Sequence, residues 1–339
     1  MNDLAQRLQH KLDNKTKPLG SLGRIEDLAL RIGLALDTDS PELREAQLVV
    51  FAADHGLAAR GVSAYPSEVT AQMVANFLAG GAAVSVLARQ HGLALTVVDC
   101  GVMAEFEPRP GLLLRKVAPG TADSSSGPAM SPTQCEQALA IGREVATTLP
   151  GNVLLLGEMG IANTSAAALL LARLTGHDIA DCAGAGTGLD TQGIARKREL
   201  LRQVLALHAD AHEPLQALAA FGGFEIAAMV GAVLEATQRR KLIVVDGFIS
   251  SSAVLVANAL VPGISRQCVF SHRSGECGHG LMLRHLGPDA ATPARALLDL
   301  ELRLGEGSGA ALAWPLLVSA CALLRDMASF ESAGVSRST

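Results

Sequence analysis

The sequence is poor in aromatic residues and has no surplus of positive charge. Aromatic side chains make up 3% of its 339 residues, and 28 Lys and Arg stand against 33 Asp and Glu. Proteins that bind single strands stack bases on aromatic rings, and proteins that bind duplexes carry clustered basic residues. With a net charge of −5 and so few rings, the chain is not expected to bind nucleic acid.

Signals for disulfides, secretion and membrane insertion are also missing. The six cysteines form no C-x-x-C pair and several lie inside apolar runs, which favours a reduced, cytoplasmic protein. The polar N-terminal residues have a helical pattern and no signal-peptide organisation. The longest apolar run, from Ala310 to Leu324, contains Pro315 and is too short to span a bilayer, so we expect a buried helix and no membrane span.

Several catalytic signatures are absent as well. The chain has no Walker A sequence, no H-E-x-x-H motif and no G-x-S-x-G elbow. No predicted strand ends in paired acids before a Thr-Gly-Gly-Thr-like loop. These absences argue against Walker-type ATP chemistry, against phosphoribosyl pyrophosphate as a donor, and against acyl transfer by a serine nucleophile.

The chain does contain six short apolar runs with the composition of buried strands. Most are rich in Val, Ile and Leu without polar alternation, and helical segments lie between them. This alternation predicts right-handed βαβ units, so the expected fold is a doubly wound, mainly parallel α/β sheet of six strands with helices on both faces. The predicted strands are Gln47–Asp54, Leu93–Asp99, Asn152–Glu158, Ile179–Ala183, Lys241–Asp246 and Arg266–Ser271.

The two chain ends are expected to pair. The first forty residues read as helical, the last thirty or so follow the final strand, and termini commonly lie close together. We therefore predict a small helical subdomain from residues 1–40 and 305–339, and a parallel α/β domain from residues 41–304. Inside the larger domain, the capping box at residues 131–134 predicts a helix to about Thr148.

Four of the predicted strands end in an acid. Ligands of open parallel sheets bind outside the carboxyl ends of the strands, so the residues at these ends should share one edge. For each acid taken singly, the alternative that it only caps the next turn stays open. The strand-end acids are Asp54, Asp99, Glu158 and Asp246, and His55, Ser271 and His272 lie beside such ends.

Two glutamates stand between glycines. Glu306 lies in Leu-Gly-Glu-Gly-Ser-Gly, residues 304–309, just ahead of the apolar helix, and Glu158 lies in Gly-Glu-Met-Gly, residues 157–160. A helix N-terminus stabilises anions, and flanking glycines let a ligand approach the backbone. Residues 163–165, Asn-Thr-Ser, should cap the helix beyond Glu158. The pair predicts general acid/base chemistry on a small anionic substrate.

Two loops are candidates for anion binding. Residues 184–188, Gly-Ala-Gly-Thr-Gly, follow the predicted fourth strand, and their N–H groups could hold a phosphate that Lys197 neutralises. As a dinucleotide fingerprint the loop is weak, and a plain tight turn is an alternative. In residues 271–279, His272, Cys277 and His279 could be metal ligands, but their spacing matches no common zinc module. We favour an anion-binding loop without a metal.

Taken together, these segments resemble the nicotinate-nucleotide–dimethylbenzimidazole phosphoribosyltransferases, which prepare the lower ligand of cobalamin. The resemblance extends along nearly the whole chain and is specific as a set. It is carried by residues 17–24 (Lys-Pro-Leu-Gly-Ser-Leu-Gly-Arg), 53–56 (Ala-Asp-His-Gly), 157–164 (Gly-Glu-Met-Gly-Ile-Ala-Asn-Thr), 246–250 (Asp-Gly-Phe-Ile-Ser), 271–274 (Ser-His-Arg-Ser) and 304–310 (Leu-Gly-Glu-Gly-Ser-Gly-Ala).

The resemblance implies transfer of phosphoribose from nicotinate mononucleotide to 5,6-dimethylbenzimidazole, with inversion at C1′ and no bound cofactor. Glu306 matches the family's catalytic base, and Glu158 would assist it. The family's fold is a six-stranded parallel sheet with a small helical domain from both termini, and its members are homodimers. The implied contacts to the nucleotide's phosphate and ribose are Gly160, Ile161, Asn163, Thr164, Gly186, Lys197, Asp246, Ser274 and Gly275.

The acceptor pocket is where this chain departs from the family pattern. Positions that can carry a serine and a glutamine correspond here to Tyr65 and Met73, and Gln72 stands one place earlier, about 100° around a helix. With Leu304 and Gly305 these residues form the predicted base pocket. The acceptor could be a benzimidazole, a methylated form, adenine or a phenol.

Two other classes of function remain as alternatives. An NAD-dependent oxidoreductase with an atypical glycine loop would bind a dinucleotide tightly and would not depend on Glu306. A non-enzymatic nucleotide-binding module would keep the phosphate loops but tolerate the loss of both glutamates.

Overall fold

The computed structural model describes residues 3–186, 188–287 and 292–336. Within these residues, six strands form one sheet in the spatial order β3-β2-β1-β4-β5-β6, and every pairing is parallel. The predicted fold class is therefore confirmed. The strands are β1 (Gln47–Ala53), β2 (Ala94–Gly101), β3 (Leu112–Leu114), β4 (Val153–Met159), β5 (Leu242–Val245) and β6 (Cys268–Phe270).

Five of the six predicted strands are present, and one is wrong. Residues Ile179–Cys182 form the short helix α7, whose N-cap Asp178 accepts a hydrogen bond from the Ala180 N–H at 2.7 Å. Alanine and aspartate have low strand propensity, and the N-cap favours a helix. The strand that was not predicted is β3, at one edge of the sheet. Its three residues are too few for a periodicity argument.

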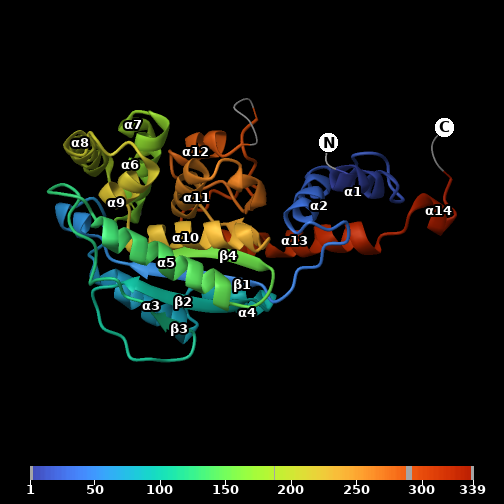
Figure 1. Ribbon diagram of the computed structural model, residues 1–339, viewed down its shortest axis with the longest axis horizontal. Helices are drawn as coiled ribbons and strands as arrows, with labels where there is room; N and C mark the ends of the chain where they lie inside the picture. The colour runs from blue at the N-terminus through green and yellow to red at the C-terminus, as the bar shows by residue number, and fades with distance from the viewer. Residues whose placement is uncertain (1–2, 187, 288–291, 337–339) are drawn as a thin grey trace.

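Helices cover both faces of the sheet (Figure 1). Val49 and Phe51 of β1 point to one core with α5, α6, α9, α10 and α11, while Leu48 and Val50 point to the other with α1–α4 and α13. This is the period-2 alternation of a strand buried on both sides. The helices are α1 (Asp3–Asp13), α2 (Arg24–Ala35), α3 (Glu68–Ala79), α4 (Ala83–His91), α5 (Pro132–Thr148), α6 (Asn163–Thr175), α8 (Thr191–Leu207), α9 (Pro214–Phe221), α10 (Phe224–Gln238), α11 (Phe248–Leu260), α12 (His279–His285), α13 (Ser308–Asp326) and α14 (Phe330–Ala333).

The N-terminal and C-terminal helices meet at one end of the molecule (Figure 1). The Thr16 N–H donates to the Ala328 carbonyl at 3.0 Å, and the Phe330 N–H donates to the Asn14 carbonyl at 3.0 Å. Helices α1, α2 and α13 also share their core with the strands. The division into residues 1–40 with 305–339 and residues 41–304 stays a prediction.

Local signals explain several helix boundaries. The predicted capping box is confirmed, because the Gln134 N–H donates to Ser131 Oγ and the Gln134 side chain accepts from the Ser131 N–H, and α5 ends at Thr148.

Two stretches, Glu68–His91 and Ser308–Asp326, are long and apolar enough to cross a bilayer by length and composition. This is weak evidence for a membrane protein, because the first is broken at Gly80 and the second packs into the core.

Helices α5 and α10 pack backbone to backbone. A Cβ atom on Gly142 of α5 would stand 1.7 Å from the Ala228 carbonyl oxygen, and one on Gly231 of α10 would stand 1.9 Å from the Leu139 carbonyl oxygen. No rotamer change relieves a clash with backbone. Glycine at these two helical positions therefore sets the distance between α5 and α10.

We predict that Gly142→Ala lowers the stability of the fold by about 1–3 kcal/mol, the usual cost of overpacking. Gly280→Ala in α12 is the control, since a Cβ there meets nothing within 4 Å. Alanine also has the better helix propensity, so the control should be neutral or slightly stabilised. Thermal and chemical unfolding measure both variants. Equal unfolding midpoints for the two would contradict the packing argument.

Candidate active site

A cavity of about 620 Å³ opens at the carboxyl edge of the sheet. It lies beyond the ends of β4 and β5, next to β1, where the direction of the strand order reverses and ligands of doubly wound sheets bind. Its walls bring together most of the predicted site. The predicted residues that line it are Tyr65, Met73, Glu158, Gly160, Ile161, Asn163, Thr164, Gly186, Asp246, Ser274, Leu304, Gly305 and Glu306.

Three predicted residues do not line the cavity. Gln72 is exposed on α3, one residue away from Met73. Lys197 is buried behind the wall, with Nζ 3.1 Å from Thr164 Oγ1. Gly275 lines a neighbouring polar cavity that shares Ser274 with the first.

The turn that presents Glu306 is built from three residues with left-handed backbone. The φ angles of Gly305, Glu306 and Gly307 are 80°, 65° and 87°. For Glu306 this conformation costs on the order of 1 kcal/mol. A Cβ on Gly157 would stand 2.6 Å from the Glu306 carbonyl oxygen, so the turn rests on the backbone of β4. We expected the glycines to open the backbone to a ligand; here they let two protein segments touch.

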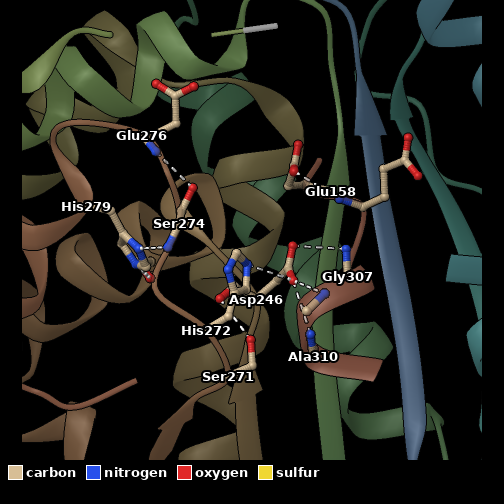
Figure 2. A network of polar contacts seen from close by, with 12 residues as sticks. Glu158, Asp246, Ser271, His272, Ser274, Glu276, His279, Gly307 and Ala310 are labelled. Atoms are coloured by element: carbon tan, nitrogen blue, oxygen red, sulfur yellow. Dashed lines mark hydrogen bonds and ion pairs between the residues drawn. The ribbon is translucent and has the colours of Figure 1, made fainter. Parts of the chain in front are cut away.

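The anion at the N-terminus of α13 is Asp246. Asp246 Oδ1 accepts from the N–H groups of Gly309 and Ala310 at 2.7 and 3.1 Å, and Oδ2 accepts from the Gly307 N–H at 3.2 Å. Figure 2 shows this carboxylate between the start of α13 and the ring of His272. The helix therefore begins with its free N–H groups satisfied by a side chain that follows β5.

Glu158 is held by two neighbours. Its Oε1 accepts from the Glu306 N–H at 3.3 Å, and its Oε2 accepts from the amide of Asn163. Asn163 was expected to cap α6, but the residue at the cap is Ala162 with φ 83° and no side-chain hydrogen bond. The Asn163 side chain binds the carboxylate instead, so the predicted cap is wrong.

Both glutamates have raised pKa values. Burial, followed by the negative charge of Asp246, raises the pKa of Glu306 to about 7 and that of Glu158 to about 8. Within residues 3–186, 188–287 and 292–336, no hydrogen bond reaches the Glu306 carboxylate, which lines the cavity. A carboxylate with a pKa near neutrality and free oxygens suits a general base.

The loop after β6 is fixed by His279. The Ser274 N–H donates to His279 Nδ1 at 2.8 Å, and His279 Nε2 lies 3.1 Å from Ser251 Oγ. Burial lowers the pKa of His279 to about 3, so the ring is neutral. Both of its nitrogens have protein partners. In the described part of the chain, no three His, Cys, Asp or Glu side chains gather as a metal site.

The far end of the cavity carries polar donors. Gly186 packs on Thr164 Oγ1, and a Cβ on Gly186 would stand 3.5 Å from Lys197 Nζ. Burial lowers the pKa of Lys197 to about 8, although the charges of Glu276 and Cys277 act to raise it.

The loop 184–188 follows the helix α7 and not a strand, which removes the structural context of a dinucleotide fingerprint. Thr187 lies outside the described residues.

The opposite wall is apolar. Val69 and Met73 of α3 line the cavity together with Ile161 and Leu304, and Tyr65, which also lines it, is half exposed. Sequence reasoning missed Val69, although it is one helical turn before Met73 and a period of four would have found it. It also missed the segment Glu301–Arg303, which carries no motif, and it assigned no role to Phe248 and Ile249, although they lie in the family-like segment 246–250.

Comparisons with known proteins identify the family of this chain. The sequence profile of the family described as Phosphoribosyltransferase matches residues 1–335. The chain belongs to this family. It is 69% identical over 334 residues to the nicotinate-nucleotide–dimethylbenzimidazole phosphoribosyltransferase of Variovorax paradoxus, covering 98% of this chain and 94% of that one. The enzyme of the same name from Cupriavidus necator is 56% identical over 336 residues, covering 98% and 95%.

Solved structures agree as well. The crystal structure of CobT from Thermus thermophilus superposes on the chain with a TM-score of 0.94 at 43% identity, covering 99% of this chain and 100% of that one. The suspected family is thus confirmed, and the oxidoreductase and the non-enzymatic module lose their support.

In this member of the phosphoribosyltransferase family, two other strand-end acids bind backbone N–H groups and do not line the cavity. Asp99 Oδ1 accepts from the N–H groups of Gly101 and Val102 at 3.0 and 2.8 Å, and Asp54 Oδ2 accepts from the Met103 N–H at 2.8 Å. For Asp99 the capping interpretation holds, whereas Asp54 binds the segment that follows the neighbouring strand β2. Of the residues expected at the common edge, Glu158, Asp246 and His272 line the cavity, whereas Asp54, His55 and Ser271 do not.

A buried ion pair supports the cavity floor from below. His55 Nε2 lies 2.7 Å from Glu225 Oε1, and both side chains are buried. Burial disfavours charged His55, but the neighbouring carboxylates of Glu225 and Asp54 raise its pKa. A Cβ on Gly160 would stand 3.3 Å from the His55 ring, so the floor rests directly on this pair.

We predict that His55→Ala destabilises the protein by about 3–5 kcal/mol, because it leaves the Glu225 charge buried without its partner. His212→Ala, at an exposed histidine, is the control. The double variant His55→Leu, Glu225→Leu removes both charges and should recover part of the loss. Urea unfolding measures all three. A His55→Ala protein as stable as the wild type would show that the pair contributes nothing.

Proposed function

We propose that the protein transfers the 5-phosphoribosyl group of nicotinate mononucleotide to 5,6-dimethylbenzimidazole, giving nicotinate and α-ribazole 5′-phosphate. One ring nitrogen of the acceptor forms a bond to ribose C1′. The bond from C1′ to the pyridinium nitrogen breaks, and its electron pair neutralises the ring. The proton on the second acceptor nitrogen passes to the Glu306 carboxylate. Attack on the face opposite the leaving group inverts the β-linkage to α.

The observation that carries this proposal is the free carboxylate of Glu306 at the cavity wall. An ionised carboxylate only accepts hydrogen bonds, so it can take the acceptor's N–H and then its proton. Its pKa of about 7 lets it be ionised at neutral pH and still accept a proton as positive charge develops on the acceptor. The leaving group is a pyridinium and needs no protonation, so a single base suffices for the transfer.

The two ends of the cavity suit the two substrates. Thr164, Gly186, Ser274 and the buried Lys197 behind Thr164 form a donor-rich end for the phosphate and ribose. Val69, Met73 and Leu304 form the apolar end for the acceptor's methylated ring. Glu306 also lines this cavity. Glu158, which accepts a hydrogen bond from the Glu306 N–H, would assist by holding the backbone of the base.

We also propose that the enzyme works as a cytoplasmic homodimer. Leu304 and Tyr65 at the cavity rim are 54% and 51% exposed, which is unusual for side chains that line a buried site. A second subunit would cover them. Sedimentation analysis of the full chain tests this assembly.

We predict that Glu306→Gln abolishes turnover and leaves nicotinate mononucleotide binding within about twofold of the wild type, since a charge needed only for proton transfer is removed. The assay incubates protein, nucleotide and acceptor and follows nicotinate and the α-riboside phosphate by mass spectrometry. Glu301→Gln, at the exposed rim of the same cavity, is the matched control. Full activity of Glu306→Gln would overturn the assigned base.

We predict that dimethylbenzimidazole is used at least about tenfold more efficiently than adenine, since each unpaired polar group of adenine against the apolar wall costs about 1–3 kcal/mol. Met73→Gln places an amide on that wall and should narrow the ratio. Gln72→Met changes the exposed neighbour and should leave it unchanged. The ratio of kcat/KM for the two acceptors, with p-cresol as a third, is the measurement. A ratio that responds equally to both variants would refute the assignment of the wall.

A further inference from the structure

We propose that Asp246 is a positioning residue: its carboxylate holds the Glu306 turn and the first turn of α13 in place at the cavity. The inference rests on the proposed role of Glu306 as the base. It assigns Asp246 to the orientation of that base, whereas the resemblance alone placed Asp246 among the substrate contacts.

Asp246 is itself rigidly held. It follows β5 directly and is 1% exposed. Its carbonyl accepts from Ser271 Oγ at 3.0 Å, and the Ser271 N–H donates to the Val245 carbonyl at 2.9 Å. Two neighbouring strand ends therefore fix the backbone from which the carboxylate projects. A carboxylate on such a base can define the position of whatever it binds.

The carboxylate binds backbone N–H groups that directly follow Glu306. Oδ2 accepts from Gly307, the residue next to Glu306, and Oδ1 accepts from Gly309 and Ala310 in the first turn of α13. His272 Nε2 lies 3.5 Å from Oδ1 (Figure 2). A carboxylate has about four acceptor positions, and these partners occupy most of them. Little capacity is left for a ribose hydroxyl.

The left-handed Glu306 needs such an anchor. Its φ of 65° is unfavourable for a residue with a side chain, so the surrounding contacts must impose it. On one side Glu158 Oε1 binds the Glu306 N–H at 3.3 Å. On the other side Asp246 binds the Gly307 N–H at 3.2 Å. Loss of the second contact frees the turn to relax and the Glu306 carboxylate to move.

The charge of Asp246 also acts on Glu306. The charged or titratable side chains that line the cavity with Glu306 are Tyr65, Glu158, Asp246, His272, Glu276, Glu301 and Arg303. After burial, Asp246 is the charge that raises the pKa of both Glu306 and Glu158. Removing it lowers both pKa values. Because Glu306 must be ionised to accept a proton, activity then sets in at a lower pH, whichever of the two coupled glutamates dominates the titration.

The experiment compares Asp246→Asn, Asp246→Glu and Asp99→Asn with the wild type. Asp99 is the matched control, because it is equally buried at 1% and also accepts backbone N–H bonds near a strand end, two against the three of Asp246, but it does not line the cavity. The readouts are kcat against pH and amide hydrogen exchange of peptides that cover residues 305–311. The exchange measurement does not depend on turnover.

For Asp246→Asn we expect the plateau value of kcat to fall about ten- to a hundredfold. The acidic limb of the kcat–pH profile should move to lower pH by about one unit. Amide hydrogen exchange at residues 305–311 should increase. Asp246→Glu keeps the charge and should lower kcat without moving the limb downward. Asp99→Asn should change none of the three readouts.

Each failure has a separate meaning. A wild type that forms no α-riboside phosphate refutes the proposed function. A wild type that forms the product, with an Asp246→Asn limb or exchange pattern that does not change, refutes the positioning role. Equal shifts of the limb in Asp246→Asn and Asp246→Glu would also refute it, because the charge would then not be the cause.

Discussion

The contact on which the site depends is that between a carboxylate from the sheet and the N-terminus of the last long helix. Asp246 follows β5, and α13 belongs to a segment that begins some sixty residues later in the chain. The three N–H bonds between them satisfy donors that a helix start would otherwise leave free, and they place negative charge where the helix dipole favours it. The Glu306 turn and its rare backbone conformation follow from this junction.

The chemistry of the site follows from crowding of negative charge. Glu158, Asp246 and Glu306 are all buried at one edge of the sheet. Three backbone N–H groups donate to the Asp246 carboxylate. The Glu306 carboxylate has no such donors among the described residues. Burial and the neighbouring negative charge of Asp246 therefore raise its pKa to about 7. Asp246 thus binds the start of α13 and also raises the pKa of Glu306, the proposed base.

Periodicity and local motifs were sufficient for much of this fold. The Val- and Leu-rich strands β1 and β4, the capping box of α5 and the glycine-framed glutamates are local features, and each stands where the sequence indicates. The helix α7 and the strand β3 were missed because their identity depends on a cap and on pairing with β2. The binding of Asp246 to α13 and of His55 to Glu225 joins residues far apart in the chain, and no local pattern records such contacts.

The position of Glu306 in the chain affects how the enzyme is made. All six strands lie between residues 47 and 270, whereas the glutamate and the helix that holds it come after residue 300. Synthesis runs from the N-terminus, and chain segments begin to fold as they emerge. The ribosome therefore releases a nearly finished sheet before the residue proposed to do the chemistry. A nascent chain therefore has most of the cavity walls before it gains Glu306, the proposed base.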